Sequence, residues 1–515
     1  MKKRLGLFFF ALTASIVLVA QTHITVDNPN SWSGEVLRPY IGQTVIFDVP
    51  MIVCTNANGN YTVSPWRKFH PESHGFAGTS EYTSTVRINN SCMFSLSGVS
   101  GYHRCGEKII GLKAKVNSTN SLSMSGGTWS GNTRSDLEGA NLRKLVGIDS
   151  CENCLLVCGF NLENYYMTWG SMGASDYSEH QDQRAKISKA LKKINADIYG
   201  LVELQLGNEA VAEIVSDLNK NLPGRNYKYF SDAATGTYQK VDFVYDANKV
   251  APISDKPGED GTEVQNRHKI MCFRQIATGE KFNFSINHFK SMNTGDEDRR
   301  INEARAVIEL YKSYSGSKSV KDKDVLFMGD LNCYAFTAPI KLFTDKGMID
   351  LHRAFHADSS YSYMYGGMAS YIDHALCNAT MYPQVKGMTA FHINSDEDDK
   401  YNYQRSSDQS MFRCSDHDPV LVGLKLDSTL VYDPSPSINS EDIIENRGMQ
   451  TMTIRNAYDE NQPSYYAIFS IRGDRLEMKP ITSNYQEVDL PLNAGMYIFY
   501  IYYNGQVYQK KFIVP

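Results

Sequence analysis

The sequence predicts a layered α/β domain of mixed strands and helices, placed between two smaller β-rich domains. The chain has 515 residues, which is more than one hydrophobic core usually organises. From Cys151 to about Leu426, short apolar strands alternate with amphipathic helices. On either side of that region, β-rich runs are separated by turn residues such as Gly, Ser and Asn. We therefore expect three structural units.

Residues 1–20 have the features of a secretory signal peptide. A basic start, Lys2 to Arg4, precedes an apolar run from Leu5 to Ala20 that is too short for a comfortable membrane span. A membrane anchor is the alternative, because Leu18 stands where the cleavage pattern favours a small residue. No second apolar stretch approaches 18 residues, so we expect a mature chain from near Gln21 without a stable membrane span.

Residues 21–143 are expected to form a small β-rich module, for which an OB-like barrel is one candidate fold. Three β-rich runs between turns are interpreted as strands: TVIFDVPMIVC, YTSTVRI and GEKIIGLKAKV. This module contains no recognisable catalytic constellation.

The central domain, residues 151–426, opens with the strand LLVCGFN. A helix follows, because apolar residues recur at helical spacing at Ile187, Ala190, Leu191 and Ile194, and the chain then enters the strand DIYGLVEL. A second amphipathic helix is expected from Asp298 to about Tyr314. The later strands are VDFVYD, KFNFSINHFK, VLFMGDLN, SYIDHALC and DHDPVLVGLKL. A PSPS linker at residues 434–437 then leads to a predicted β-sandwich over residues 438–515.

Charge and cysteine content narrow the function classes. The formal net charge of −5 argues against a protein that coats nucleic acid through lysine and arginine, but not against a nuclease whose metal ions meet the phosphate. Cys151 and Cys154 form a C-x-x-C pair among ten cysteines. A zinc or redox site is disfavoured because no second Cys or His pair has finger-like spacing, so a disulfide or buried thiols are preferred.

Several strands of the central domain end in polar residues that a buried strand would not favour. Any one of them is more often a turn former or a hydrogen-bonded cap than a functional group. Because all are acidic, amide or imidazole side chains at the edges of apolar strands, one shared cleft explains them more economically. They are Asn161, Glu203, His288, Asp330 with Asn332, Asp373 with His374, and Asp416 with His417.

This residue set suits phosphodiester hydrolysis. That reaction needs a hard cation, a base for water, an acid for the leaving oxygen and donors for the other phosphate oxygens. Carboxylate and amide oxygens favour Mg²⁺ or Mn²⁺ over zinc, and Glu203 is the natural first ligand. Asp330 and Asn332 are expected to point to the same side of one strand. A histidine between carboxylates can have a raised pKa, which suits acid or base work.

At this point the motifs resemble a known family. GFNLENYY, DIYGLVELQ, INHFKS, GDLNCY, YIDHAL and SDHDPV are similar, in order and character, to the motifs of the endonuclease/exonuclease/phosphatase superfamily, which includes pancreatic-type deoxyribonuclease. The resemblance spans about Cys151 to Leu426. It implies a two-layered β-sandwich flanked by helices, and a secreted Mg²⁺-dependent nuclease acting on DNA, with RNA also considered and with Mn²⁺ or Ca²⁺ as alternative metals.

The resemblance also implies roles for individual residues. Asn161, Glu203 and Asp416 would bind the metal, and Asp330 and Asn332 would position the nucleophile and phosphate. His417, oriented by Asp373, and His288 would be the two catalytic imidazoles. Arg267 and Lys290 are candidates for phosphate contacts, with plain solvated surface as the equally weighted alternative. Cys333 and Cys414 depart from the family's small residues, and buried thiols are favoured there over a disulfide with Cys377.

Two further resemblances concern export of the protein. GDLNCYAFTAPI is similar to bacterial secreted nucleases, and the segment ending LNAGMYIFYIYYNGQVYQKKFIVP resembles the C-terminal sorting domain of type IX secretion cargo, although an ordinary hairpin would share its Asn504–Gly505 turn. The protein is thus expected outside a bacterial cell or on its surface.

Two alternative functions remain open. The first is an enzyme that acts on other phosphoesters, either sphingomyelinase-like or specific for inositol phosphates. Asp418 disfavours the inositol phosphate enzyme, because inositol phosphatases usually place Arg at this position. A non-enzymatic adhesin would not need both imidazoles and a metal carboxylate.

Overall fold

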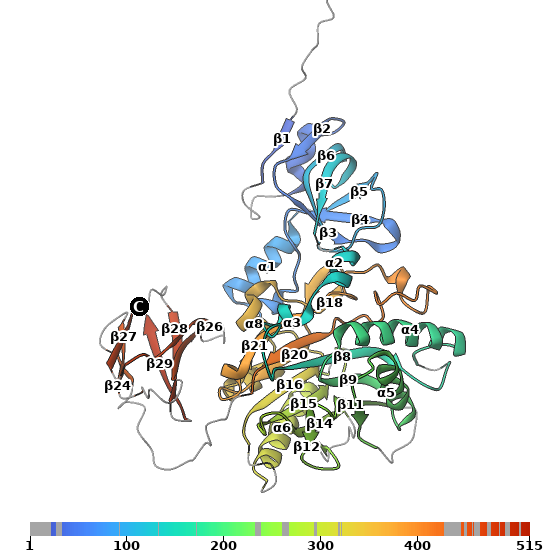
Figure 1. Cartoon of the computed structure of the whole chain (residues 1–515). Helices are drawn as coiled ribbons and strands as arrows, with labels where there is room; N and C mark the ends of the chain where they lie inside the picture. The colour runs from blue at the N-terminus through green and yellow to red at the C-terminus, as the bar shows by residue number, and fades with distance from the viewer. Residues whose placement is uncertain are drawn as a thin grey trace, which may run out of the picture.

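The computed structural model of the chain has three β-containing parts, seen in Figure 1 as a module above a central domain with a small sandwich beside it. The described residues are 22–26, 33–91, 93–131, 133–170, 172–231, 238–259, 267–292, 296–317, 320, 322–426, 444–446, 451–455, 457, 464–470, 475–483, 485–489, 495–503 and 506–514. The expected signal peptide, the PSPS linker and the Asn504–Gly505 turn lie outside them. Among the described helices, none has the length and apolar character needed to cross a membrane.

The N-terminal module is built on one curved sheet. Strand β6 pairs with β2, β3 and β7, while β7 also pairs with β5, so the pairings of β6, β3, β4, β5 and β7 close into a ring. Its core contains the apolar side chains of Val45, Phe47 and Phe94. The strands in sheet order are β1 (Thr22–Ile24), β2 (Thr44–Phe47), β6 (Lys108–Ser118), β3 (Met51–Thr55), β4 (Tyr61–Ser64), β5 (Phe94–Ser97) and β7 (Ser121–Ser130).

The prediction of a strand at YTSTVRI is wrong, because this run forms helix α1 (Ser80–Asn90). Its threonines and valine favour strands, but the Thr79 side chain caps the helix by accepting a hydrogen bond from the Tyr82 N–H, and Glu81 lies in the first turn. The capping signal therefore outweighs the strand propensity. The module's other helices are η1 (Gly34–Tyr40), η2 (Ala57–Gly59) and η3 (Pro71–Ser73). Helices α2 (Arg134–Gly139) and α3 (Leu142–Leu145) follow the module and bury Leu137 and Leu142 in the core of the central domain.

Two mixed sheets pack face to face in the central domain, which confirms the predicted fold class. At Gly200, a Cβ atom would lie 2.8 Å from Phe284 and 2.7 Å from Ile286 of the opposite sheet, so only glycine allows this close approach. The first sheet has the order β10 (Tyr227–Tyr229), β11 (Gln239–Asp246), β9 (Ile198–Gln205), β8 (Leu155–Tyr165), β22 (Val420–Leu424), β21 (Val385–Ala390). The second is β12 (Val250–Pro252), β14 (His268–Gln275), β15 (Lys281–His288), β16 (Val325–Asp330), β20 (Asp373–Cys377), β17 (Ile349–Asp350), with β13 (Gly258–Glu259) beside β14.

Helices cover the outer faces of both sheets (Figure 1). Ile187 and Leu191 of α4 pack with Leu156 and Tyr199 of the first sheet, as the helical spacing predicted. The helix predicted from Asp298 to about Tyr314 is α6, which covers the second sheet. The helices are α4 (Tyr177–Ile194), α5 (Glu209–Asn221), α6 (Glu297–Ser315), α7 (Ala338–Asp345), α8 (Leu351–His356), η4 (Ala357–Ser359), η5 (Tyr382–Gln384) and η6 (Asp399–Tyr401). A short hairpin, β18 (Tyr363–Tyr365) and β19 (Met368–Ser370), lies between η4 and β20 in the chain.

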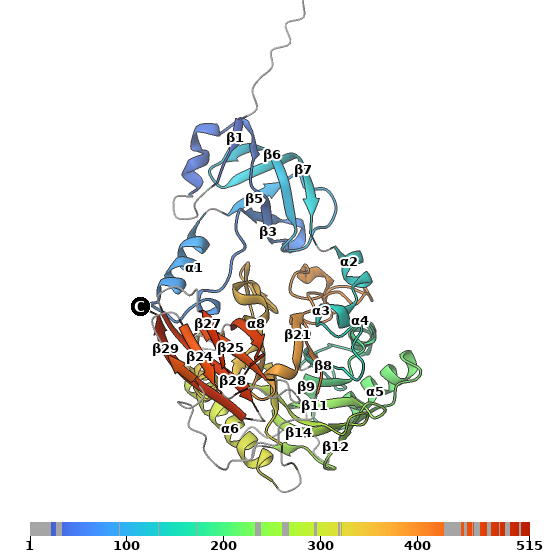
Figure 2. The ribbon, with the colours of Figure 1, turned by 60° about the vertical axis from the view of Figure 1, so that its left-hand side comes forward.

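The C-terminal part consists of two small antiparallel sheets that lie beside the central domain near α8 (Figure 2). Phe469 and Tyr500 share a buried cluster with Tyr382 of the central domain, and the Arg475 guanidinium lies over the rings of Phe355 and Tyr382. One sheet is β23 (Ile444–Asn446), β24 (Thr451–Arg455), β27 (Tyr485–Asp489). The other is β26 (Arg475–Pro480), β25 (Tyr465–Ser470), β28 (Gly495–Tyr503), β29 (Gln506–Val514).

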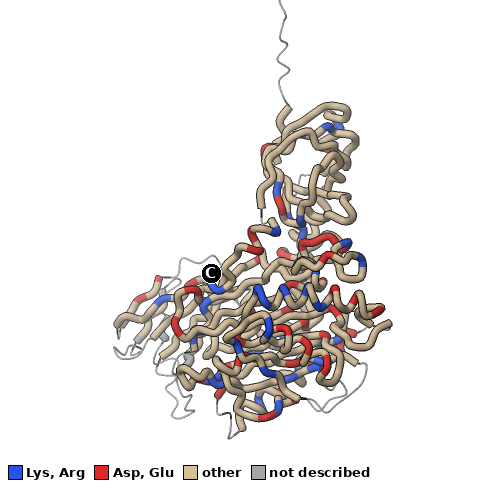
Figure 3. Tube along the Cα trace, turned by 45° about the vertical axis from the view of Figure 1, so that its right-hand side comes forward, with Lys and Arg blue, Asp and Glu red and all other residues tan. Residues whose placement is uncertain are grey.

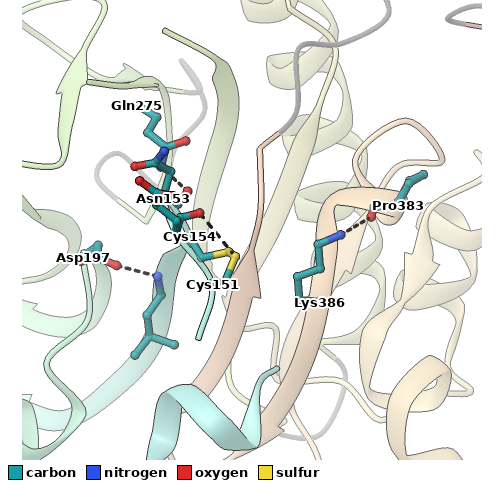
Figure 4. The surroundings of a disulfide bond; sticks show 9 residues. Cys151, Asn153, Cys154, Asp197, Gln275, Pro383 and Lys386 are labelled. Atoms are coloured by element: carbon teal, nitrogen blue, oxygen red, sulfur yellow. Dashed lines mark hydrogen bonds between the residues drawn. A yellow bond between two sulfur atoms is a disulfide. The ribbon is translucent and has the colours of Figure 1, made fainter. Parts of the chain in front are cut away.

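Cys151 and Cys154 form a disulfide just before β8, so their sulfurs are not zinc ligands. Figure 4 shows this bond beside Asn153, whose carbonyl accepts a hydrogen bond of 2.6 Å from the Gln275 side chain. Cys333, Cys377 and Cys414 are buried free thiols, as favoured from the sequence.

An ion-pair network, here called the interface latch, joins the N-terminal module to the central domain. It consists of Arg67, Arg104 and Arg134 from the N-terminal segment and Asp396 and Glu397 from the loop after β21. The fully buried Glu397 carboxylate forms ion pairs with both Arg104 and Arg134, the latter at 2.6 Å. The Arg67 guanidinium lies 2.8 Å from the Asp396 carboxylate. Figure 3 shows basic and acidic segments meeting where the module joins the central domain. The module is therefore docked through buried charges.

Replacing Glu397 with Gln is expected to destabilise the protein by about 3–5 kcal/mol, because the buried Arg104 guanidinium and the partly buried Arg134 guanidinium lose their shared counter-charge. Urea unfolding followed by tryptophan fluorescence measures this loss. The control is Asp345→Asn, which removes an exposed pair with Lys341 and should change the free energy of unfolding by less than about 0.5 kcal/mol. Equal stability of the two variants would contradict a structural role for the latch.

Candidate active site

The polar residues singled out in the sequence converge at one edge of the two sheets. Strands β8 and β9 are parallel, as are β15 and β16, so the carboxyl ends of each pair lie together. Strand β20 runs antiparallel to β16, which brings its first residue, Asp373, opposite Asp330. The loop before β22 carries Asp416 and His417. Both sheets therefore contribute side chains to one cluster.

Asp330 lies between two imidazoles. Its Oδ2 atom is 3.7 Å from His288 Nε2 and 3.9 Å from His417 Nε2, and it accepts a hydrogen bond of 3.1 Å from Asn161 Nδ2. His288 Nε2 is also 3.6 Å from Glu203 Oε1, and His417 Nε2 is 3.8 Å from Asp416 Oδ1. The structure thus brings together the residues assigned to metal binding and to acid or base work.

The His417 ring is oriented by the carboxylate behind it. Nδ1 of His417 lies 2.9 and 3.0 Å from the two Asp373 oxygens, which directs Nε2 toward Asp330. The Ser362 hydroxyl donates to Asp373 Oδ2 at 2.7 Å, and the buried His352 ring contacts the Asp373 carbonyl at 2.8 Å. Asp373 is therefore held in place while it fixes the tautomer of His417.

The two imidazoles have opposite electrostatic surroundings. Burial lowers the pKa of His417, but the carboxylates of Asp373, Asp416 and Asp330 outweigh this effect and raise it well above the ordinary value. Burial and the neighbouring Arg267 cation bring the pKa of His288 well below its ordinary value. One ring therefore favours the cationic form and the other the neutral form, as a pair of acid and base groups requires.

The carboxylates of the cluster repel one another. Burial and the Asp416 charge raise the pKa of Glu203. The pKa of Asp330 is raised to about 7, first by burial and also by Asp373 and Glu203. Buried carboxylates crowded in this way fit a divalent cation, which would neutralise them. Ligand atoms of Glu203, His288 and Asp330 lie within 4.8 Å of one another, an oxygen-rich set suited to Mg²⁺ or Mn²⁺.

Left-handed backbone conformations gather at the cluster. Glu203 has φ 65° although it is not glycine, and its carboxylate accepts a hydrogen bond of 2.9 Å from the Asn164 N–H. Glu163 and Asn164 have φ values of 54° and 57°, and Arg413 has 55°. Such conformations cost about 1–3 kcal/mol each and persist where surrounding contacts hold them, most often at functional sites.

Asp330 and Asn332 were expected to meet because they point to the same side of one strand. This explanation is wrong, although the two residues do interact. Asn332 lies beyond the end of β16 with φ 46°, so strand alternation does not place it. Its N–H donates to Asp330 Oδ1 at 2.9 Å, and its side-chain amide donates to Asp330 Oδ2 at 3.1 Å. Gly329 has φ 121°, and a Cβ there would lie 2.0 Å from the Asn287 carbonyl, which explains the glycine before Asp330.

Three residues that the sequence reasoning did not single out also line the cluster. Glu163 accepts hydrogen bonds of 2.9 and 2.8 Å from Asn402, and burial followed by the Asp416 charge raises its pKa to about 8. Ser362 supports Asp373, and the Tyr363 ring lies 4.9 Å from that of His417. Glu163 stands two residues after Asn161 in the motif GFNLENYY, so its position in the sequence could have suggested that it belongs to the site. Ser362 and Tyr363 stand at the start of the β18–β19 hairpin, and no sequence motif marks them.

Arg267 and Lys290, the candidate phosphate contacts, lie on the second-sheet side of the cluster. The Arg267 guanidinium donates to the Phe289 carbonyl at 2.6 Å and interacts electrostatically with Asp330 and Glu203. Its Nε is buried and has no hydrogen-bond partner within the described part of the chain. Lys290 is 28% exposed, and its ammonium lies 4.0 Å from Asp296. Arg267 thus interacts with carboxylates of the cluster, whereas Lys290 faces Asp296.

The sequence profile of the Endonuclease/Exonuclease/phosphatase family matches residues 160–417. The chain belongs to this family. The matched span contains most of the two central sheets and every residue of the cluster described above. The family depends on divalent metals, and the donor set around Glu203 and Asp330 fits one, so the protein is a phosphoester hydrolase of this family.

Three solved structures are similar to about half of the chain at low identity. A Bacteroides thetaiotaomicron protein of the same family is 21% identical, with 53% of this chain and 98% of that one covered and a TM-score of 0.40. A mannosyl-6-phosphatase of Bacteroides thetaiotaomicron is 20% identical over 52% and 98% of the two chains, with a TM-score of 0.38. D. rerio TDP2 complexed with single strand DNA product is 15% identical over 53% and 100%, also with a TM-score of 0.38. No curated protein matches the sequence significantly.

Proposed function

We propose that the protein is a secreted, metal-dependent nuclease that hydrolyses phosphodiester bonds of DNA, with RNA as a second substrate class. The observation that carries this proposal is the placement of Asp330 between the imidazoles of His288 and His417, beside Glu203. Two imidazoles with opposite pKa shifts next to a carboxylate cluster suit a reaction in which one proton leaves water and another reaches the departing oxygen.

Each side chain has a proposed task. Asn161, Glu203 and Asp416 would hold Mg²⁺, for which Mn²⁺ or Ca²⁺ could substitute at the same oxygens. The metal would supply Lewis-acid stabilisation of the phosphate charge. His417, fixed by Asp373, and His288 exchange protons with the attacking water and the leaving oxygen, while Asp330 and Asn332 orient the water and phosphate. Arg267 and Lys290 would add positive charge along the substrate backbone.

The alternatives are a sphingomyelinase-like enzyme and an inositol phosphate enzyme of the same family. Asp418, which follows His417, argues against the second. Its carboxylate is fully buried and accepts hydrogen bonds from the backbone N–H groups of Asn394 and Ser395, at 2.8 and 3.0 Å. This position therefore stabilises a loop and offers no cation to a highly phosphorylated ligand.

We also propose that the chain is exported and displayed through its two ends. The basic and apolar start supports a signal peptide, and the C-terminal β-sandwich supports recognition by type IX secretion machinery. The long β28–β29 hairpin, paired from Gly495 with Val514 to Tyr503 with Gln506, is the part of that sandwich with the sorting-domain resemblance. Expression in a type IX host with and without residues 438–515 would test whether surface display requires them.

Purified protein is expected to cleave plasmid DNA in Mg²⁺ at low salt, to lose this activity in EDTA, and to regain it when excess Mg²⁺ is added. Activity should decline as salt rises, because salt competes with cation contacts to phosphate. Gel assays with DNA and RNA, and phosphate or choline-phosphate release from inositol phosphates and sphingomyelin, measure the alternatives in parallel. Hydrolysis of either small substrate with no cleavage of DNA or RNA would overturn the nuclease assignment.

A further inference from the structure

Three tyrosines line one side of the cluster. Tyr363 and Tyr365 stand two residues apart on β18, so their side chains share a face of the hairpin, and the Tyr363 ring lies 4.9 Å from His417. Tyr334, two residues after Asn332, interacts electrostatically with both. Tyr365 is 69% exposed. We call these three residues the tyrosine strip.

The N-terminal module holds the tyrosine strip in place. The His70 ring stacks on the Tyr334 ring with centroids 3.6 Å apart and an interplanar angle of 14°. Backbone hydrogen bonds join the module to β19: the His70 N–H donates to the Ala369 carbonyl at 2.9 Å, and the Ala369 N–H donates to the Lys68 carbonyl at 2.8 Å. The module therefore extends the hairpin that carries two of the three tyrosines.

The strip also borders open space beside the catalytic residues. A cavity of about 160 Å³ is lined by Asn332 and Tyr334 and, from the N-terminal module, by Glu72. The module thus forms part of the wall next to the place where the phosphate would bind. None of the three tyrosines belongs to the residues to which the hydrolysis itself was assigned, so their grouping needs a separate explanation.

We propose that the tyrosine strip binds unpaired nucleobases next to the scissile phosphate, and that the enzyme therefore prefers single-stranded to duplex DNA. This inference rests on the proposed nuclease function. Every base has a π face that can stack on a tyrosine ring, so such a strip adds affinity without sequence preference. Bases in an intact duplex stack on each other, which leaves only the backbone for recognition. The exposed ring of Tyr365 is the part of the strip most open to a base.

The test compares three substrates of one length: a single-stranded deoxyoligonucleotide, its duplex, and an abasic oligonucleotide made with stable tetrahydrofuran residues. For the wild-type protein in Mg²⁺, we expect a lower KM for the single strand than for either of the others. Tyr365→Ala is expected to raise KM for the single strand roughly 5- to 100-fold, toward that of the abasic strand, because one stacking contact is removed. Tyr365→Phe keeps the ring and should keep the preference.

The outcomes distinguish failure of the base-stacking proposal from failure of the proposed nuclease function. Equal KM values of the wild-type protein for the single-stranded and abasic oligonucleotides would show that the tyrosine strip does not bind bases, and the nuclease assignment would be unaffected. A Tyr365→Ala variant that keeps the wild-type preference would do the same. If the wild-type protein cleaves none of the three but hydrolyses a small phosphomonoester, the nuclease assignment itself fails. Thermal unfolding of both variants should match the wild-type protein, since the side chain is largely exposed.

Discussion

Replacing Glu203 with Gln is expected to lower kcat/KM for Mg²⁺-dependent DNA cleavage by roughly 10³-fold or more, because a metal site that contributes several kcal/mol to the transition state loses a charged ligand. The Glu203 side chain faces His288 and interacts with Asp416, and its carboxylate accepts a hydrogen bond from the Asn164 N–H that the carbonyl oxygen of the Gln side chain could also accept, so the amide should occupy the same position. Initial rates across a Mg²⁺ titration measure both the loss of turnover and the weaker metal affinity.

The matched control is Glu209→Gln, which makes the same chemical change at an exposed position in the first turn of α5. It should keep wild-type turnover and the wild-type Mg²⁺ dependence. Removing the Glu203 charge should also relieve repulsion among the buried carboxylates, so the variant is expected to be at least as stable as the wild-type protein. A Glu203→Gln variant with wild-type turnover would show that Glu203 is not a metal ligand.

Much of the central domain could be predicted because local pattern and tertiary position agree there. The helical spacing through Ile187 and Leu191 matched α4, and polar residues recur at the ends of several buried strands, which one shared cleft explains. Strand β9 is parallel to β8 and strand β16 to β15, and packing of the two sheets places the carboxyl ends of β9 and β16 at one edge, where Glu203 and Asp330 meet. The fold class and the grouping of the site followed from these two features.

Other features depend on contacts between distant segments and could not be found locally. The run from Tyr82 to Ile88 has strand-forming residues, yet a cap at Thr79 makes it helical. Asn332 reaches Asp330 through a turn with positive φ, which alternation along a strand does not describe. The interface latch joins Arg104 to Glu397 across almost 300 positions, and no periodicity marks either partner.

Replacing Asp373 with Asn is expected to slow DNA cleavage by roughly 10²–10⁴-fold, because the amide can stabilise the wrong tautomer of His417 and removes the charge that favours its cation. In the wild-type protein both Asp373 oxygens lie within 3.0 Å of His417 Nδ1, and this carboxylate is the first of those that raise the pKa of His417 against the effect of burial. Single-turnover rates at saturating DNA and Mg²⁺ measure the chemical step separately from binding.

Whether Asp373 acts only through His417 is tested by comparing Asp373→Asn with His417→Ala and with the variant that carries both changes. If Asp373 acts only through His417, each single change should cost a similar factor and the double variant should be little slower than His417→Ala alone, since residues acting as a unit are not additive. Ser362→Ala removes one hydrogen bond to Asp373 while keeping its charge, so it should cost far less. Multiplicative losses in the double variant would show instead that Asp373 contributes independently of His417, most directly through its place beside Asp330 in the carboxylate cluster.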